Sequence, residues 1–312
     1  MNREFYHEPV LKNEVTELLV TRTGGVYVDC TLGGGGHFRA VAEKLDSSAT
    51  VIGIDRDQDA IAWNKSHMPA PGPSMIFELE RFSQFDKVLQ KHQINSVDGF
   101  LLDLGLSSFQ IDNVERGFSY MQDSSLDMRM SVSDEATASD LLEETGEEEL
   151  ADLLSRYGEI KNPLRMAEAI KSCVPLRTSS DLRKCLSREY GPNLDVKIIA
   201  RVFQSLRIAV NDELGELRRF LDKAISFLSK GGRLAVIAYH SLEDRMVKEF
   251  IREQEQSCIC PPGLPVCRCS KSTMLKRVTK GAVKASQEEI GSNPRSRSAR
   301  LRVAEKVGVA GE

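Results

Sequence analysis

The feature that most constrains the fold is a run of four glycines, Gly33 to Gly36, between a strand-like and a helix-like segment. Residues 26–30 are β-branched and aromatic, which is typical of a buried strand. After the glycines, apolar side chains recur three and four residues apart, which indicates one face of a helix. Glycines at such a junction let the backbone approach a ligand closely. The sequence therefore favours a ligand-binding loop over a plain turn.

The same alternation continues through the first hundred residues. Short apolar runs predict three more strands, at residues 50–55, 75–79 and 97–103. The segments between them carry apolar side chains at helical spacing. Strands joined in this way predict βαβ units and a mostly parallel sheet, which is the α/β fold class.

The pattern changes near residue 112 and returns near residue 213. Between these points the sequence has helical stripes but no convincing strand. An apolar strand at residues 233–239 and a last, edge strand at residues 298–304 follow. We therefore expect a discontinuous α/β domain, interrupted by an inserted all-helical domain. The expected domains are residues 1–111 with 213–312, and residues 112–212.

The glycine loop does not fit the common nucleotide motifs. A dinucleotide fingerprint, G-x-G-x-x-G, fails at its last glycine in both registers, where Phe38 or Arg39 stands. No Walker-type P-loop is present either. A nucleoside with little phosphate remains as the ligand. Asp55 ends the second strand, where its carboxylate can accept hydrogen bonds from both ribose hydroxyls or cap the next helix, and we favour the ribose.

Two further strand ends are polar. The fourth strand leads into Asp103, Ser107, Ser108 and Gln110, which supply hydrogen-bonding groups at the edge where open α/β sheets bind ligands. A polar exit from a strand is the plainer interpretation. The next apolar strand leads into residues 239–245, where His240 alone is expected to be a structural histidine.

Charge is divided unevenly along the chain. The net charge is −4, which argues against nonspecific coating of nucleic acid. Residues 112–150 carry twelve acidic and two basic side chains, whereas residues 271–302 carry nine basic and two acidic ones. One face is therefore expected to attract phosphate and another to repel it, unless both segments are simply solvated.

The chain has seven cysteines, and its charged first residues lack the apolar stretch of a secretory signal. Free thiols in a reducing cytosol are expected rather than a disulfide framework. No apolar run approaches the about 20 residues of a membrane helix. Two C-x-C pairs flank a proline-rich turn and predict either a structural zinc site or four free thiols. These cysteines are Cys258, Cys260, Cys267 and Cys269.

Several short motifs, in one order, carry a resemblance to a known family. They are residues 7–11, 29–37, 54–57, 103–108, 116–120, 126–130, 240–245 and 293–297. With these motifs the chain resembles the bacterial 16S ribosomal RNA cytosine-N4 methyltransferase family, RsmH or MraW. The resemblance runs from residue 7 to about residue 305 and is highly specific.

The resemblance implies a Rossmann-like S-adenosylmethionine-dependent methyltransferase domain with an inserted helical domain that recognises substrate. The implied substrate is one cytidine in the decoding centre of 16S ribosomal RNA, in the small ribosomal subunit. A cytoplasmic protein without membrane contact is expected, and the oligomeric state stays open, a homodimer included. The implied cofactor residues are Gly35, Gly36, His37, Asp55, Phe82, Asp103 and Gln110, and Gly33 lies in the same loop.

Two assignments keep alternatives. Phe82 is implied to pack on the adenine, or else belongs to a core stripe with Phe85. Asp103 is the candidate catalytic residue, and could hold the cofactor's amino group, accept a proton from the N4 amine, or do both. Many amino-methyltransferases have Asp or Asn followed by Pro-Pro and an aromatic here, and this chain does not. The identity of the amine acceptor therefore stays open, and no metal ligand is expected in the catalytic site.

Two other functions compete with the enzyme. The first is an RNA-binding assembly factor with a vestigial nucleoside pocket. For the protein itself, we expect residues 271–302 to contact the phosphate backbone of ribosomal RNA and residues 112–150 to face away from most of it. A nicotinamide-dependent reductase would share the α/β domain, but the failed dinucleotide fingerprint speaks against it. A methyl-transfer assay separates the enzyme from the assembly factor.

Overall fold

The computed structural model describes residues 8–68, 72–107, 110, 113–191, 194–260, 268–269 and 271–308. The chain divides into two compact units. The first consists of Met1–Gly105 and Glu216–Glu312, and the second of Leu106–Gly215. The domain boundaries expected from the sequence, after residues 111 and 212, fall a few residues inside the second unit.

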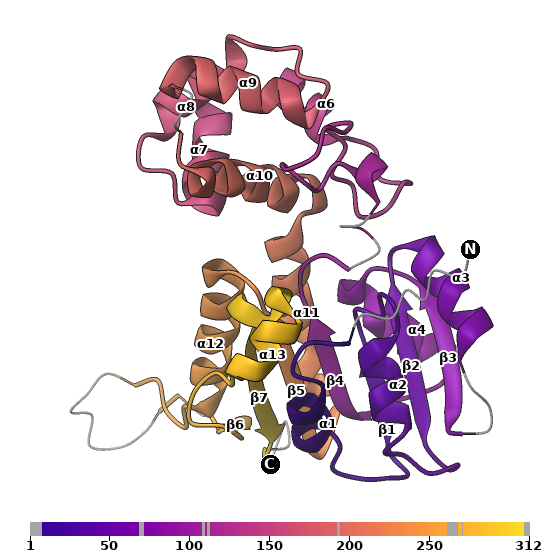
Figure 1. Ribbon diagram of the computed structural model, residues 1–312. Coiled ribbons are helices and arrows are strands. Elements are labelled where there is room, and N and C mark those ends of the chain that lie inside the picture. The colour runs from indigo at the N-terminus through magenta and orange to yellow at the C-terminus, as the bar shows by residue number, and fades with distance from the viewer. Residues whose placement is uncertain are drawn as a thin grey trace. The chain divides into compact units, whose positions relative to one another are not determined.

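The first unit is built on a seven-stranded sheet in the order β3-β2-β1-β4-β5-β7-β6 (Figure 1). The first five strands run parallel, and β7 is antiparallel to both of its neighbours. The parallel α/β prediction is therefore confirmed. The strands are β1 (Val26–Asp29), β2 (Thr50–Asp55), β3 (Ser74–Leu79), β4 (Val97–Asp103), β5 (Leu228–Ala238), β6 (Leu275–Arg277) and β7 (Arg300–Lys306).

The expected edge position of the last strand is wrong. β7 lies between β5 and β6, and the short strand β6 forms the edge. Buried Leu301 and Val303 show that both neighbours and a helical layer cover β7. β6 has only three residues, too few for an alternating pattern, so the sequence did not reveal the strand that covers β7.

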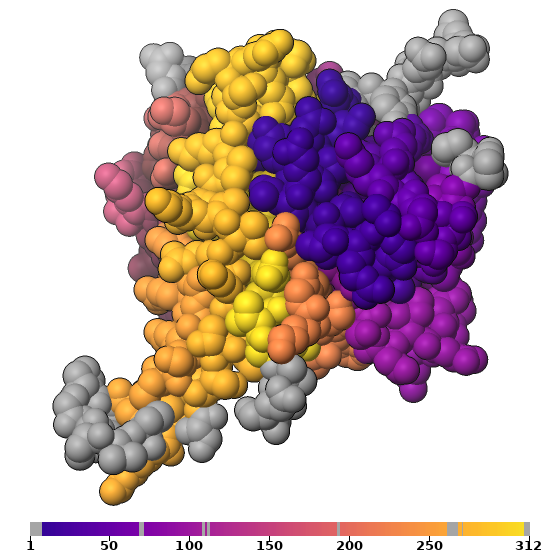
Figure 2. Space-filling view, turned by 90° about the horizontal axis from the view of Figure 1, so that it is seen from below, coloured from indigo at the N-terminus to yellow at the C-terminus, as the bar shows by residue number. Residues whose placement is uncertain are grey.

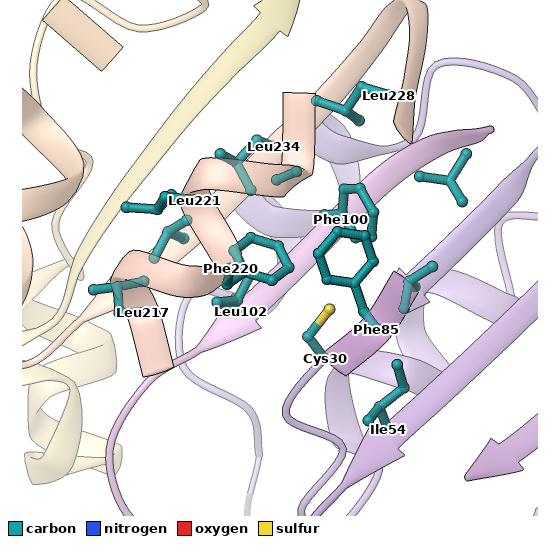
Figure 3. Close-up of a cluster of buried hydrophobic side chains, with 14 of the residues drawn as sticks. Cys30, Ile54, Phe85, Phe100, Leu102, Leu217, Phe220, Leu221, Leu228 and Leu234 are labelled. Atoms are coloured by element: carbon teal, nitrogen blue, oxygen red, sulfur yellow. The ribbon is translucent and has the colours of Figure 1, made fainter. Parts of the chain in front are cut away.

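Helices cover both faces of this sheet because successive strand residues point to opposite sides. Phe100 and Leu102 of β4 pack into one core, where Phe100 meets Phe85 with ring centroids 4.8 Å apart and Phe220 at 5.4 Å (Figure 3). Leu101 points into the other core. The helices of this unit are α1 (Lys12–Leu19), α2 (Gly36–Ala42), α3 (Gln58–His67), α4 (Phe85–Lys91), α11 (Glu213–Phe227), α12 (Ser241–Glu255) and α13 (Gln287–Ser292).

The N-terminal segment of the described chain lies beside the region of α13 in the first unit. Figure 2 shows the indigo N-terminal segment against the yellow C-terminal segment. The backbone N–H of Leu11 donates to Glu289 Oε1 at 2.8 Å, and the Asn293 side-chain amide donates to the Glu8 carbonyl at 3.2 Å. The segment before β1 is thereby fixed next to the glycine loop, where Pro9 contacts Gly36.

The second unit is helical, as the sequence predicts, and its described residues contain no strand longer than an isolated bridge. Capping boxes at Thr137 and Thr178 start two of the helices. The unit has one apolar core of its own. No described helix of either unit is long and apolar enough to span a membrane. The helices are α6 (Ala138–Glu144), α7 (Glu147–Gly158), α8 (Pro163–Lys171), α9 (Ser179–Tyr190) and α10 (Val196–Asn211).

The start and the end of the second unit are held by one short segment, residues 128–130. Asn211, at the end of α10, donates to the Met128 carbonyl and accepts from the Met130 N–H, both at 2.8 Å. Near the start, the Gln110 side-chain amide donates to the Met130 carbonyl at 3.4 Å. The two ends of the unit are therefore joined through the same three residues.

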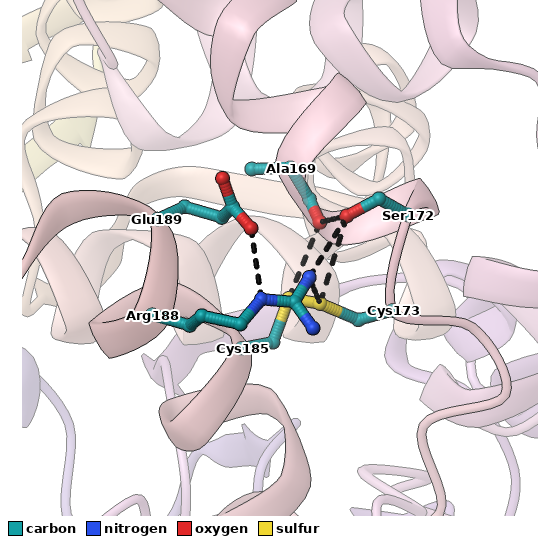
Figure 4. Close-up of a disulfide and its surroundings, with 6 residues drawn as sticks. All are labelled: Ala169, Ser172, Cys173, Cys185, Arg188 and Glu189. Atoms are coloured by element: carbon teal, nitrogen blue, oxygen red, sulfur yellow. Dashed lines mark hydrogen bonds and ion pairs between the residues drawn. A yellow bond between two sulfur atoms is a disulfide. The ribbon is translucent and has the colours of Figure 1, made fainter.

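A disulfide joins Cys173, after α8, to Cys185 in α9 (Figure 4). The expectation of free thiols is wrong for this pair. Their Cα atoms are 6.1 Å apart, within the range that a disulfide spans. The pairing depends on how α8 and α9 pack, which the spacing of the two cysteines in the sequence does not reveal. Arg188 Nη2 lies 3.0 Å from Cys173 Sγ.

Candidate active site

The carboxyl ends of the parallel strands bring the predicted residues of the first unit to one edge of the sheet. β1 ends at Asp29, β2 at Asp55 and β4 at Asp103. Tyr239 follows β5 directly. The glycine loop leads from β1 to α2 at the same edge (Figure 1).

The backbone of the loop requires glycine at two positions. Gly33 and Gly35 have positive φ angles of 47° and 75°. A Cβ atom on Gly35 would lie 1.8 Å from Asn64 Oδ1, so a larger residue would displace this side chain. A Cβ on Gly34, in contrast, would meet nothing within 4 Å. The loop is thus packed on one side and, among the described residues, open at Gly34.

Two side chains hold the loop in this shape. The Gly33 N–H donates to Asp55 Oδ2 at 2.7 Å, and its carbonyl accepts from Asn64 Nδ2 at 2.8 Å. Asp55 Oδ1 also accepts from the N–H of Asp57 at 2.9 Å. Asp57, not Asp55, caps α3. An ionised carboxylate has about four acceptor positions, so Asp55 retains capacity for hydroxyl donors.

Asp103 lies at the end of β4, close to residues of three other segments. Its Oδ1 accepts the Tyr239 hydroxyl at 2.8 Å. Its backbone N–H donates to Thr31 Oγ1 at 2.6 Å, which ties β4 to the residue before the glycine loop. His37 Nε2 lies 3.6 Å from Asp103 Oδ2, beyond hydrogen-bond distance. Asp103 is therefore oriented by Tyr239 and faces His37.

All three strand-end carboxyl groups have raised pKa values. Burial is the largest cause in each case, and it raises the pKa of Asp29 to about 7, of Asp55 to about 6 and of Asp103 to about 7. Repulsion adds to this effect, from Asp103 and Asp55 at Asp29 and from Glu243 at Asp103. A positively charged ligand bound here would relieve the repulsion between these carboxylates.

Polar atoms without partners lie in the same place. His37 is only 5% exposed, and among the described residues neither ring nitrogen has a hydrogen-bond partner. Burial, and then the positive charge of Lys12, lower the pKa of His37 to about 4, so its ring is neutral at neutral pH. Asp29 Oδ2 and Asn64 Oδ1 are also buried without a partner in the described structure. Such groups indicate a site that a polar ligand completes.

The other predicted residues lie as follows. Phe82 is partly buried and packs on the core beside Phe220, with ring centroids 6.0 Å apart, so the core-stripe interpretation holds at least for one of its faces. Gln110 belongs to the second unit, where it accepts from the Ser107 N–H at 3.1 Å. Ser108 lies outside the described residues. His240 is structural as predicted: it caps α12, with Nδ1 accepting from the Glu243 N–H.

Asn64 and Tyr239 are site residues that the sequence did not reveal. Asn64 lies inside a helical stripe, and only its fully buried position identifies it as the partner of the glycine loop. Tyr239 is the last residue of a predicted strand, and this position at a strand end was the signal that could have identified it. Its bond to Asp103 depends on β5 pairing beside β4, and the two residues are distant in the sequence.

The fold and this edge define an α/β protein with a candidate ligand site at the ends of its parallel strands. The chain belongs to the MraW methylase family, whose model matches residues 4–307. It is therefore a methyltransferase. The chain is 41% identical to the ribosomal RNA small subunit methyltransferase H of Desulfosudis oleivorans, over 97% of this chain and 99% of the relative. The proteins of that name from Heliobacterium mobile and Clostridioides difficile are 42% and 41% identical, over 97% of this chain and 100% of each relative.

Proposed function

We propose that the protein transfers a methyl group from S-adenosylmethionine to the N4 amine of one cytidine in the decoding centre of 16S ribosomal RNA. The observation that carries this proposal is the group of strand-end carboxylates, Asp29, Asp55 and Asp103, with pKa values raised to about 6 or 7. A ligand with a positive charge is what such a group favours. Family membership and the names of the relatives support methyl transfer to small-subunit ribosomal RNA.

The residues present fit this cofactor. When bound, S-adenosylmethionine supplies an electrophilic methyl group on a positively charged sulfur. The glycine loop, with Gly33, Gly35 and Gly36, would let the methionine part approach the backbone closely, beside His37. Asp55 would accept from the ribose hydroxyls with its remaining acceptor positions. Phe82 would offer the face turned away from the core to the adenine.

Asp103 is proposed to act on the amine. Tyr239 fixes one of its oxygens, and the other is directed at His37 within an environment that excludes much of the water. A fixed carboxylate there stabilises positive charge as it develops on the N4 amine, and can accept its proton. The raised pKa, about 7, suits a group that takes up and releases a proton near neutral pH. A cofactor-binding role for Gln110 stays a prediction from the family resemblance.

The RNA side of the proposal rests on charge. The second unit is proposed to recognise the substrate, and the target cytidine must leave its stack to reach the strand ends. In the basic stretch, Lys276 and Lys280 are exposed and suited to phosphate. Arg277 pairs with Glu255, and Arg300 and Arg302 pair with Asp244, so these three arginines are partly committed within the protein. Because its proposed substrate is ribosomal RNA, the protein is proposed to act in the cytoplasm. The proposal holds for a monomer and for a homodimer.

The methylated position follows from where the cysteines lie. Methylation at C5 of cytosine needs a thiolate to attack the ring, and residues 103–110 contain no cysteine. The one cysteine beside the strand ends, Cys30, is 1% exposed and points into the core (Figure 3). Burial, and then the charge of Asp29, raise the pKa of its thiol well above the usual value. The lack of a suitable cysteine in residues 103–110 thus supports the N4 amine over C5 as the proposed methylated position.

The proposal is tested by methyl transfer to small ribosomal subunits from a strain that lacks this gene. Tritium from labelled S-adenosylmethionine is expected in 16S ribosomal RNA, and mass spectrometry of the digested RNA should identify N4-methylcytidine. Subunits from the parent strain, already modified, serve as the control. Detection of 5-methylcytidine, or transfer to protein only, would contradict the proposal.

A further inference from the structure

We propose that Cys258, Cys260 and Cys269 bind a structural zinc ion, which closes the segment between α12 and β6. Their sulfur atoms all lie within 4.8 Å of one another. The sulfurs of Cys258 and Cys269 are 3.8 Å apart. Two thiolates on one tetrahedral zinc ion, with Zn–S bonds of about 2.3 Å, are separated by about 3.8 Å. Cys258 and Cys269 therefore already have the spacing of two ligands on one ion, and the Cys260 sulfur lies within 4.8 Å of both.

The hydrogen bonds of the cluster favour thiolates. Each of the three sulfurs accepts a backbone N–H at 3.4 Å: Cys258 from Cys260, Cys260 from Arg268, and Cys269 from Ile259. Hydrogen bonds to a charged group stabilise its charged form. Metal binding requires the thiolate, because the proton leaves when the metal–sulfur bond forms. The backbone is thus folded around the sulfurs in the way that metal coordination needs.

The described residues of this segment form no apolar core of their own. Both of its ends are fixed at the end of α12, where the Met274 N–H donates to the Gln254 carbonyl at 2.9 Å and Thr273 Oγ1 donates to the Glu255 carbonyl at 3.2 Å. None of the described residues between these points is buried, and Ile259 is 61% exposed. Ordering a long loop is costly when no apolar core forms. A metal ion joining the first arm to the second would supply that stabilisation.

The donor set selects the kind of metal. Thiolates are soft ligands, which favour zinc, copper(I) or iron–sulfur clusters over magnesium or calcium. The short sulfur–sulfur distance suits one ion, and zinc needs no redox partner. Three protein sulfurs leave the fourth tetrahedral position for another group. Cys267, which the sequence analysis included, lies outside the described residues.

Elemental analysis of the full-length protein, purified without chelators or a metal-affinity tag, tests the site. About one zinc ion per chain is expected, as for other structural zinc sites. Cys258→Ser and Cys269→Ser should each lose most of it. A matched control, Cys173→Ser combined with Cys185→Ser, should retain it, because those residues lie in the second unit. Less than one-tenth of this zinc in freshly prepared wild-type protein would overturn the proposal.

A second measurement does not depend on whether the variants fold. Wild-type protein stripped of metal and titrated with Co²⁺ alone should develop the intense near-ultraviolet band of thiolate-to-cobalt charge transfer. Zinc should bleach this band, and limited proteolysis should cut near residues 256–273 only in the metal-free protein. Absence of the band in protein whose thiols are shown to be reduced would overturn the proposal, as would a disulfide between these cysteines in protein prepared under argon.

Discussion

The strand-end carboxylates of the first unit and a capping carboxylate of the second have opposite pKa shifts. In the first unit, burial raises the pKa values of Asp29, Asp55 and Asp103 at the strand ends. In the second unit, hydrogen bonds from the side chain and the backbone of Thr137 lower the pKa of Asp140, in a capping box at the surface of α6. The second unit is richer in acidic residues, yet its acids stabilise helices. The buried environment of the acidic residues, and not how many there are in a unit, therefore identifies the candidate active site.

The largest expected effect comes from removing the charge of Asp103. Asp103→Asn keeps the shape of the side chain but cannot stabilise positive charge on the amine. We expect a folded protein whose rate of methyl transfer falls by at least about 100-fold, the usual scale for one positioned acid–base group. Single-turnover assays with saturating cofactor measure this rate. Near-normal turnover would show that the Asp103 carboxylate does not take part in methyl transfer, and its raised pKa would then not distinguish a catalytic acid from the capping acids of the second unit.

Asp55 should affect binding more than chemistry. Asp55→Ala removes the acceptor of the ribose hydroxyls and also the acceptor of the Gly33 N–H. The loss should be roughly 1–3 kcal/mol, or about 5- to 150-fold in affinity for S-adenosylmethionine. Calorimetry without RNA measures it. Asp55→Asn helps to separate the two roles, because an amide oxygen can still accept from Gly33; wild-type affinity in the alanine variant would place the ribose elsewhere.

Cofactor affinity should rise with pH near neutrality. Burial raises the pKa of Asp103 from its ordinary value of 3.8 to about 7, so below pH 7 it holds a proton that a positively charged ligand displaces. One such group predicts about a tenfold gain in affinity from pH 6 to pH 8. The ligand-free protein should show the opposite trend, since a raised carboxyl pKa makes stability fall as pH rises from about 4 to 7.

The control for this pH effect is S-adenosylhomocysteine, which lacks the sulfonium charge. Its affinity should depend less steeply on pH than that of S-adenosylmethionine, and Asp103→Asn should flatten the profile for both. Equal slopes for the two ligands would show that the strand-end carboxylates do not sense the sulfonium charge.

The smallest effect is expected from the second unit. Asp140→Ala breaks the capping box at the start of α6 and should reduce stability by about 1 kcal/mol. Thermal unfolding followed by circular dichroism should show a transition lowered by a few degrees. Affinity for S-adenosylmethionine should stay at the wild-type value. A loss of cofactor affinity comparable with that of Asp55→Ala would erase the distinction between the two kinds of acid.

The local sequence pattern was sufficient to locate most strands but not to show which strands pair with each other. Apolar runs located β1, β2 and β4 closely because buried parallel strands are continuous and β-branched. The order of strands in the sheet depends on contacts between distant segments, so the sequence placed β7 at the edge and did not reveal β6. The Cys173–Cys185 pair likewise depends on packing between helices.

The candidate site shows the same division. The run of four glycines made the loop apparent, because glycine adopts positive φ angles more readily than other residues. The bond between Tyr239 and Asp103 was not, because the whole second unit separates the two residues in the sequence. The roles assigned to Gly33, His37, Phe82 and Gln110 stay predictions, which binding measurements on single variants can test.

The closure of the second unit by residues 128–130 bears on how quickly the sheet can assemble. β4 and β5 pair directly, with Gly99 opposite Arg233, although the second unit separates them in the chain. An unfolded connection of that length makes the search for this pairing slow. Once Gln110 and Asn211 are held by the same short segment, the connection behaves as a short loop. Folding of the insertion before the sheet would thus speed the pairing of β4 with β5.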